Sequence, residues 1–476
     1  MPDDPDSAAI EALRLIGPDP PDWVPERLGP DGKPIDCNVV IVGGGQSGCA
    51  LAFALRRAGI GRVLVIDAAA DGEAAGIWRG TARMTVLRTA KTLPGPELGI
   101  PALGFRAWYE ARHGRAAYDA MVRIPRTDWA DYLAWYRRFL GIPVRYATRL
   151  ARIEPAGGHF RLHLDGAGSV TARKVILATG FSGNGGPYLP PAVAALPPSL
   201  RAHTAEAIDF ARLRGKRVAV VGAAASAFDA AAVALEQGAA CVHLFARREA
   251  ISAVPVARVR GYAGAYDNYP ALPDRIRWHQ AIRFRRAGSN PPADAIERVM
   301  RFPQFRLHLA APWLAAREAD GGIAATAADG EHRFDFVIAG TGYRMDLAAV
   351  PELADIAGDI RLWRDQFSPP PGEEDEFLAA HPYLGDGHEF LEKRPGTAPF
   401  LADIHVQNPA GFVSHGVPAG DVPSMKRGIP AIAARISRDL FLADLDRHEA
   451  RLLKRPGPEF APDLYAAAIW RRGEAG

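Results

Sequence analysis

Two stretches of the chain share one pattern of apolar and polar positions. In the first, 38–66, an apolar run leads into a glycine-rich turn, a helix-like segment that begins at Gln46, and a second apolar run. In the second, 217–245, an apolar run leads into a turn of small residues, another helix-like segment and the run CVHLF. Short apolar runs bounded by turns predict buried strands, and the segments between them predict helices. Each stretch is therefore predicted to be a βαβ unit.

The spacing of the two units indicates the fold class. They begin about 180 residues apart, and each has its own small-residue entry, which predicts two nucleotide-binding domains and not tandem short repeats. Between them lie an aromatic helix pattern around Trp129–Tyr136, strand patterns over 144–173, and the run KVILATG. A similar run, DFVIAGTGY, follows the second unit. The predicted fold is α/β with two Rossmann-like dinucleotide-binding domains.

The first turn has the full spacing of a dinucleotide-binding motif. Gly43 permits the tight turn, Gly45 lets the backbone approach a diphosphate, and Gly48 lets helix and strand pack closely. The diphosphate is then expected at the helix N-terminus, where free N–H groups favour negative charge. Asp67 closes the second strand, where its carboxylate can accept from ribose hydroxyls, which favours FAD or NAD and disfavours a 2′-phosphate. The predicted contacts of this turn are Gly43, Gly45, Gln46, Ser47, Gly48 and Asp67.

The second turn departs from the motif at one position. Gly222 keeps the first glycine and Ala227 is an accepted third residue, but Ala224 places a methyl group where the diphosphate should come closest. The strand after this turn ends in Arg247 and Arg248 in place of a carboxylate, and arginines there can hold the 2′-phosphate of NADP. The predicted contacts of this turn are Gly222, Ala224, Ser226, Ala227, Arg247 and Arg248.

Composition excludes several other classes of protein. The chain has 57 Lys and Arg against 54 Asp and Glu, a net charge of +3 with no basic run, so no nucleic-acid partner is expected. We expect no secretory signal and no membrane span, because the N-terminus is acidic and the most apolar window is interrupted. The three cysteines form no CxxC, which disfavours disulfides and a dithiol centre and makes a cytoplasmic setting the default. No His/Cys cluster has ligand spacing, so no metal is expected.

Together these motifs resemble the flavin-dependent monooxygenases with two dinucleotide-binding domains, a group of N-hydroxylating, FMO-like and Baeyer–Villiger enzymes. The resemblance covers roughly residues 36–445 and is strongest at VVIVGGGQSGCALA and AAGIWRG. It implies an NADP domain inserted into the FAD domain. The implied parts are an FAD domain of 1–210 and 336–476, and an NADP domain of 211–335.

The resemblance also implies residues around the flavin. The AAGIWRG segment places Gly76, Trp78 and Arg79 near FAD, and the ATG and GTGY strand ends add Gly180, Thr341 and Gly342. The segment MTVLRTAKTLPG is similar to the stretch that passes the flavin ring in N-hydroxylating members. Arg88 and Lys91 in that segment, and His415 near the C-terminus, are therefore the candidate catalytic residues; salt-bridged surface cations and a packed histidine are the alternatives.

The implied activity is oxygenation of a small molecule by an oxidoreductase that uses FAD, NADPH and O2. Hydride passes from NADPH to the flavin, and a flavin C4a-peroxide then oxygenates an amine, a sulfide or a ketone. Two alternatives stay open. One is a flavoprotein reductase or oxidase that releases superoxide or hydrogen peroxide, and the other is a redox-sensing nucleotide-binding protein without turnover, which Ala224 favours.

Overall fold

The computed structural model describes residues 4–166, 168–256, 262–416 and 421–473. Its first sheet has the strand order β3-β2-β1-β6-β5-β4, with β15 also paired to β6. The pairs among β1, β2, β3, β6 and β15 are parallel, whereas β4 and β5 form an antiparallel edge. The strands are β1 (Cys37–Val42), β2 (Val63–Ile66), β3 (Val144–Arg145), β4 (Leu150–Pro155), β5 (Phe160–Leu164), β6 (Gly168–Leu177) and β15 (Ile404–Val406).

Strand β1 is buried along its whole length because both faces of this sheet are covered. Val39 and Ile41 point into a core shared with α2 (Gln46–Arg57) and α14 (Val422–Ala443). Val40 and Val42 point into the opposite core, formed with segments between 345 and 410. This alternation is the two-residue period of a strand.

The second sheet is parallel throughout, in the order β10-β9-β8-β14-β7. Helices α7 (Ala225–Glu236) and α10 (Ala293–Met300) cover one face. A three-stranded antiparallel sheet and α6 (Pro191–Ala194) cover the other. The strands are β7 (Arg201–His203), β8 (Arg217–Val221), β9 (Cys241–Phe245), β10 (Phe305–His308), β14 (Phe336–Ala339), and, in the antiparallel sheet, β11 (Trp313–Ala319), β12 (Gly322–Ala327) and β13 (Gly330–Phe334).

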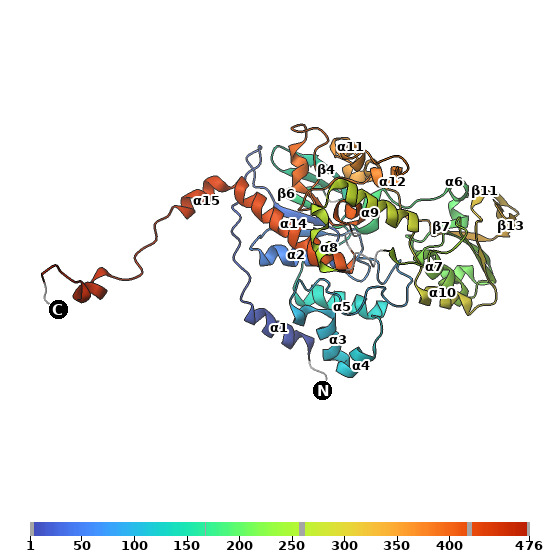
Figure 1. Ribbon diagram of the computed structural model, residues 1–476, viewed down its shortest axis with the longest axis horizontal. Helices are drawn as coiled ribbons and strands as arrows, with labels where there is room; N and C mark the ends of the chain where they lie inside the picture. Colours follow the sequence, from blue (N-terminus) through green and yellow to red (C-terminus); the bar gives the residue numbers. More distant parts are fainter. Residues whose placement is uncertain (1–3, 167, 257–261, 417–420, 474–476) are drawn as a thin grey trace.

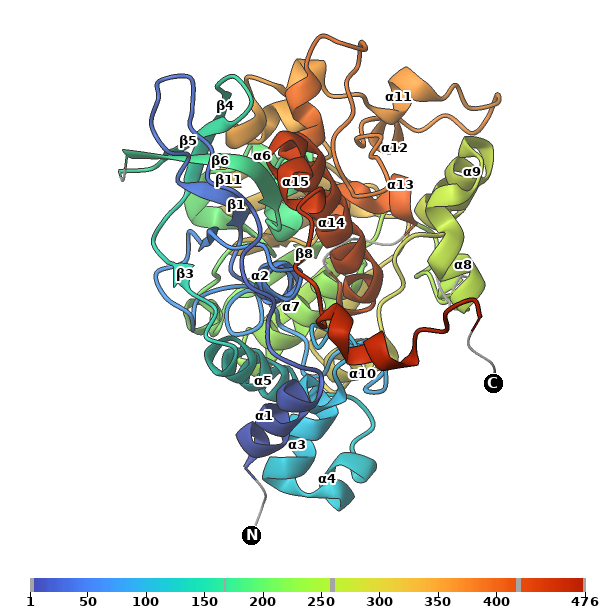
Figure 2. The ribbon, with the colours of Figure 1, turned by 90° about the vertical axis from the view of Figure 1, so that its left-hand side faces the viewer.

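A helical lobe packs below α2 and contains the predicted aromatic helix. Helices α1 (Pro5–Leu15), α3 (Phe105–His113), α4 (Arg115–Ala120) and α5 (Arg126–Phe139) gather at one end of the molecule (Figures 1 and 2). Helix α5 buries Trp129, Tyr132, Trp135 and Tyr136, which confirms the helix expected there. The remaining helices are α8 (Ala263–Asn268), α9 (Asp274–Ala287), α11 (Trp363–Gln366), α12 (Glu376–Ala379), α13 (Phe412–His415) and α15 (Leu445–Leu452).

Two further features concern the C-terminal segment and the apolar character of the helices. Beyond α15 the chain extends away from the body, and its described residues are exposed (Figure 1). None of the helices in the described part of the chain is both long and apolar enough to cross a membrane.

Candidate active site

The first turn can be built only with glycine at two positions. Gly43 follows β1 with φ +109°, and a Cβ atom there would lie 2.4 Å from the carbonyl oxygen of Ala178. A Cβ atom at Gly48, in the first turn of α2, would lie 1.8 Å from the carbonyl oxygen of Gly43. Both distances are far below van der Waals contact, so these two glycines let strand, turn and helix close on one another.

Gly45 has a different role, because the protein leaves its surroundings open. A Cβ atom there would meet only the Cα of Gly76, at 3.8 Å. Gly45 is the N-cap of α2 and no side chain caps the helix, so N–H groups of its first turn stay available to an anion. A cavity borders this helix end; it is lined by residues of 44–49, 72–79 and α5. The turn thus fits the diphosphate of a dinucleotide.

Asp67 lies directly behind this turn. One carboxylate oxygen accepts from the backbone N–H of Gly44 at 2.7 Å, and the other accepts from that of Ala69 at 2.7 Å. Each oxygen has a second lone pair, so these bonds fix the carboxylate without exhausting it as an acceptor. Its predicted contact with a ribose is compatible with this position and remains a prediction.

Two indoles converge on the first residue of α2. The ring N–H groups of Trp78 and Trp129 each donate to the side-chain oxygen of Gln46 at 3.2 Å. The two rings meet edge to face, with centroids 6.3 Å apart. Ser47, beside Gln46, is buried in the helix start. The predicted cofactor neighbours Gln46 and Trp78 are thereby joined to the aromatic helix α5.

Arg79 lies at the rim of the same cavity. Its Nε is 2.8 Å from Glu73, and its other end pairs with Asp131 of α5. The side chain is 41% exposed, so these pairs orient it at the surface with little gain in stability.

The second turn repeats the geometry of the first with one exchange of residues. Gly222 has φ +119°, and a Cβ atom there would lie 2.2 Å from the carbonyl oxygen of Gly340. The carbonyl oxygen of Gly340 thus excludes a side chain at Gly222 in the same way as that of Ala178 excludes one at Gly43. A Cβ atom at Gly340 would itself lie 2.6 Å from the Cβ of Ala227. Because the third position of this turn carries a methyl group, the neighbouring strand end must carry none.

Ala224, the departure from the motif, causes no strain in the turn. It is the N-cap of α7 with φ −87° and ψ 178°, and its counterpart Gly45 has φ −73° and ψ −167°. Both are extended backbone that any residue adopts. No side chain caps α7, and Ser226 in its first turn is exposed. The methyl group of Ala224 therefore affects what approaches the turn and not the turn itself.

The two arginines after β9 are held differently. Arg248 donates to the carbonyl oxygen of Ala287 at 2.9 Å, at the end of α9, and is partly buried. Arg247 is exposed. Of the two predicted partners of a 2′-phosphate, Arg247 is the one that the fold leaves at the surface.

The two matching strand ends face the two turns. Gly180 (φ +59°) follows β6, and Asn408 donates to the hydroxyl of the preceding Thr179 at 3.1 Å. Gly342 (φ +81°) follows β14, and its carbonyl oxygen accepts from the N–H of Tyr188 at 2.9 Å. The hydroxyl of Thr341 donates to the carbonyl oxygen of Tyr188. These contacts fix the crossing between the two sheets.

Arg88 joins the two units. Its guanidinium lies 3.6 Å from the carboxylate of Asp229, a buried residue of α7, which Arg298 also reaches at 3.2 Å. Burial raises the pKa of Asp229 above its usual range, while Arg88 and Arg298 act in the opposite direction. The predicted catalytic residue Arg88 is thus placed against α7, the helix of the second unit.

Lys91 borders a large cleft. Its ammonium donates to the carbonyl oxygens of Tyr118 at 2.6 Å and Asp119 at 3.2 Å, and lies 4.5 Å from the centre of the Tyr118 ring. The cleft has a volume of about 660 Å³ and is formed by residues of 87–107 together with Glu110, Tyr118, Ile124, Trp129 and Val422. Trp129 both lines this cleft and donates to Gln46, so the cleft adjoins the start of α2.

His415 is a packed residue at the end of α13. Its ring stacks on that of His388, with centroids 3.7 Å apart and planes 17° apart. Burial, aided by His388, holds the pKa of His415 well below its ordinary value, so the ring is neutral at physiological pH. Among the described residues its Nε2 has no hydrogen-bond partner.

Comparison with known proteins identifies the family. A model described as pyridine nucleotide-disulphide oxidoreductase matches residues 40–263, which contain both turns. Over 425 residues, 89% of each protein, the chain is 43% identical to the FAD-dependent urate hydroxylase of Xanthomonas campestris pv. campestris. The chain belongs to the flavin-dependent monooxygenases with two dinucleotide-binding domains.

Solved structures of this monooxygenase family share the fold. The ornithine N-hydroxylase of Kutzneria sp. 744 aligns with a TM-score of 0.66 and 17% identity, covering 85% of this chain and 99% of that one. The L-lysine 6-monooxygenase of Pseudomonas syringae aligns with a TM-score of 0.66 and 19% identity, covering 86% and 99%. The predicted α/β fold with two Rossmann-like units is thereby confirmed.

Membership of this family also establishes the class of reaction. The chain is a flavin-dependent oxidoreductase of the monooxygenase type, and the predicted pair of cofactors, FAD and NADPH, is confirmed at the level of the family. The individual site residues and the domain boundaries remain predictions.

The structure of this monooxygenase places further residues beside the predicted site that the sequence did not single out. Trp129 was predicted only as part of an aromatic helix, yet its indole meets Gln46. Asp229 and Gly340 were not among the predicted site residues, although Gly340 begins the strand end GTGY whose recurrence the sequence shows. No local signal pairs Asp229 with Arg88, because they lie on different units.

Proposed function

We propose that this monooxygenase hydroxylates a flat, electron-rich nitrogen heterocycle of the urate class, with NADPH as reductant. The observation that carries the proposal is the 43% identity, over 89% of both chains, to a urate hydroxylase. This substrate class replaces the amine, sulfide or ketone expected from the wider family.

The cleft beside α2 supports this substrate class. Its walls carry the aromatic rings of Phe105, Tyr118 and Trp129, and its rim carries Lys91 and Arg106. Flat rings stack well on aromatic side chains, and a few convergent polar groups orient a ligand in a mainly apolar pocket. A urate-type anion offers such a ring, together with negative charge for the cations.

Glu97 is the proposed proton acceptor of the cleft. One carboxylate oxygen accepts from the N–H of Gly95 at 2.7 Å, which fixes the side chain against the wall. Burial raises the pKa of Glu97 above its usual range, which strengthens it as a base for a ring N–H. Removal of that proton raises the electron density of the ring carbon that is hydroxylated.

The first turn is proposed to hold FAD. The N–H groups at the start of α2 bind the diphosphate, Asp67 accepts from the ribose, and Trp78 with Arg79 closes the cavity. When bound, the flavin accepts hydride from NADPH and delivers one oxygen atom of O2 to the substrate. The chain itself orients the two reactants and keeps water away from them. Gly222, Ala224, Ser226 and Ala227, with Arg247, are proposed to hold NADPH.

The proposed domains are an FAD domain of 1–210 and 336–476 and an inserted NADP domain of 211–335. The first sheet takes β1 to β6 from before and β15 from after the second unit, which supports an insertion. Strands β7 and β14 lie outside 211–335 in the sequence but pair within the second sheet, so the chain passes between the two proposed domains next to these strands. A cytoplasmic setting is proposed as well: Cys37, Cys49 and Cys241 are free thiols, and burial raises the pKa of Cys37 to about 11 and of Cys49 to about 12.

The test compares substrates in an assay of NADPH oxidation with an oxygen electrode. Urate should stimulate NADPH oxidation, with O2 consumed in equal amount and one ¹⁸O atom from ¹⁸O2 appearing in the product. Stimulation by L-ornithine or L-lysine, but not by urate, would overturn the proposed substrate class. Hydrogen peroxide in place of an oxygenated product would favour the oxidase alternative.

Variants of the cleft locate the activity. Glu97→Gln and Trp129→Phe should lower urate-stimulated turnover while FAD stays bound. Arg115→Ala is the matched control, since this side chain is 77% exposed and lies outside the cleft. Equal turnover in all three variants would contradict the assignment of the substrate to this cleft.

A further inference from the structure

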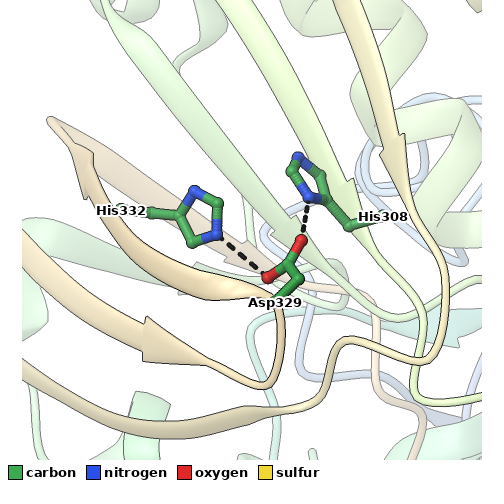
Figure 3. A group of neighbouring side chains, drawn as sticks. All are labelled: His308, Asp329 and His332. Carbon is green, nitrogen blue, oxygen red and sulfur yellow. Dashed lines mark hydrogen bonds and ion pairs between the residues drawn. The ribbon is translucent and has the colours of Figure 1, made fainter.

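Three side chains from two sheets converge in the second unit, where the end of β10 meets the β12–β13 hairpin. His308 is the last residue of β10, Asp329 lies in the turn between β12 and β13, and His332 lies within β13. His308 Nδ1 is 2.5 Å from one carboxylate oxygen of Asp329, and His332 Nε2 is 3.0 Å from the other. Figure 3 shows the two imidazoles pointing at the carboxylate from two sides.

The spacing of these atoms is close to that which a metal ion requires. One ligand atom from each of the three residues lies within 4.8 Å of the other two. A tetrahedral zinc ion holds its N and O ligands at about 2.0–2.2 Å, so that neighbouring ligand atoms stand about 3.3–3.5 Å apart. Small rotations of the three side chains are therefore enough to admit an ion. The residues are 21 and 3 positions apart in the sequence, which is why no ligand motif is visible there.

The surroundings hold both imidazoles in place. His308 stacks on Phe245, with centroids 4.3 Å and planes 13° apart, and His332 meets the same ring edge-on at 5.1 Å. His308 Nε2 lies 2.9 Å from Nδ1 of His243 on β9. When His308 binds an ion through Nδ1, its proton is on Nε2 and is donated to His243. Metal-binding histidines usually have such a partner for the second ring nitrogen.

We propose that His308, Asp329 and His332 form a binding site for a divalent transition-metal ion of the zinc type. Two imidazoles and one carboxylate suit such ions, whereas Mg²⁺ and Ca²⁺ prefer oxygen ligands. The side chains of His308, His332 and Asp329 are 17%, 18% and 34% exposed, which leaves an open side for the ion and for water as a fourth ligand.

The ion would cross-link two sheets beside the NADPH contacts. Strand β10 is an edge strand of the parallel sheet, whereas Asp329 and His332 belong to the β12–β13 hairpin. Directly after His308, the N–H of Ala310 donates to the carbonyl oxygen of Arg248 at 2.8 Å. Binding therefore fixes the strand end that carries Arg247 and Arg248, without any contact to the flavin side.

The test is calorimetric titration of tag-free, EDTA-treated protein that retains its flavin, with ZnCl2 and, separately, MgCl2. One Zn²⁺ per chain should bind and Mg²⁺ should not. Asp329→Asn and His332→Gln should weaken zinc binding at least about 10-fold, and His243→Gln should weaken it about 10-fold through its bond to His308. His163→Gln is the matched control, because it removes a histidine paired with a carboxylate elsewhere, at 2.5 Å from Glu154.

The outcomes decide the proposal. It is overturned when the wild type binds no stoichiometric zinc, or when Asp329→Asn and His332→Gln, with unchanged circular dichroism, bind it as the wild type does. A second measurement needs no variant. Zinc should raise the Tm of the wild type and protect His308 and His332 from diethyl pyrocarbonate, mapped by mass spectrometry. Modification that zinc leaves unchanged would contradict the site even if the variants failed to fold.

Discussion

Ala227 leaves no room for a side chain at Gly340: a Cβ atom at Gly340 would lie 2.6 Å from the Cβ of Ala227 and 2.8 Å from its Cα. In the first unit the corresponding residues are Gly48 in the helix and Ala178 at the strand end. The alanine of the pair thus belongs to the helix in the second unit and to the strand end in the first. The accepted alanine at the third position of the second turn is thus matched by a glycine far away in the sequence. Strand β14 and helix α7 can approach only because one member of the pair lacks a side chain.

Gly340→Ala should therefore destabilise the protein by about 1–3 kcal/mol, the usual cost of overpacking. Ala227→Gly should restore part of that loss in the double variant. The rescue is partial, since the Cα of residue 227 remains close and a helical glycine costs about 0.5–1 kcal/mol. Urea unfolding of the wild type, both single variants and the double variant measures the coupling. Strict additivity of the two changes would show that the two positions do not compete for space.

The second and third glycines of the first motif, Gly45 and Gly48, should respond differently to substitution by alanine. Gly45→Ala places a methyl group where the protein offers room, so the chain should fold and FAD binding should weaken. Gly48→Ala places it 1.8 Å from the carbonyl oxygen of Gly43, so the unit should fail to pack. Flavin absorbance per chain and thermal melts separate the two effects. A Gly45→Val variant with a full flavin complement would show that FAD does not bind at this turn.

Buried histidines make the stability depend on pH. Burial lowers the pKa of His381 and His388 to about 4 and of His405 to about 3. In the unfolded chain a histidine has a pKa of about 6.5. Below pH 6.5 the unfolded chain therefore binds protons at these histidines that the folded chain does not bind. The free energy of unfolding then falls by about 1.4 kcal/mol per pH unit for each histidine. The loss continues until the folded pKa is reached.

Urea midpoints measured between pH 4.5 and 7.5 should show this slope. His381→Gln should reduce it by about 1.4 kcal/mol per pH unit, whatever its effect on absolute stability. The matched control is His113→Gln, at an exposed position, which should leave the slope as it is. A flat profile for the wild type would mean that these rings are protonated in the folded state.

The sequence predicted what is local and missed what is distant. Each βαβ unit was predictable because its strand, turn and helix lie within thirty residues and each glycine has a specific steric reason. The pair of Arg88 and Asp229 was not predictable, since it depends on how the two units dock. The pair of Ala227 and Gly340 depends on how β14, far along the chain, returns to lie beside β8 in the second sheet. His415 illustrates the same limit: the sequence left a catalytic residue and a packed histidine as alternatives, and its stacking on His388 depends on contacts between distant segments. Likewise Asp329 and its two histidines meet only when two sheets pack.

The different settings of Arg247 and Arg248 lead to a prediction for coenzyme choice. Arg247→Ala should weaken NADPH binding by about 1.5–3 kcal/mol, the value of a charge-assisted phosphate contact, and leave NADH nearly unchanged. Arg248→Ala should mainly lower stability, because Arg248 supports the end of α9 through its bond to Ala287. Dissociation constants for both coenzymes, measured anaerobically, test the assignment. An equal loss for NADPH and NADH in Arg247→Ala would show that this side chain does not read the 2′-phosphate.

Ala224→Gly should tighten NADPH binding. The backbone at Ala224 has the same extended conformation as that at Gly45, so the methyl group is tolerated by the turn and faces whatever approaches it. Crowding of a bound diphosphate costs about 1–3 kcal/mol in a close-packed setting. Glycine loosens the free turn by about 0.5–1 kcal/mol, which offsets the low end of that gain. At about 1.4 kcal/mol per tenfold, the net improvement in the dissociation constant should lie between none and roughly one to two decades. The measurement is anaerobic titration of wild type and Ala224→Gly with NADPH, at equal flavin content. Because the turn itself carries no strain, weaker binding in the variant would mean that the nucleotide packs against the methyl group, and that Ala224 is a contact and not an obstacle.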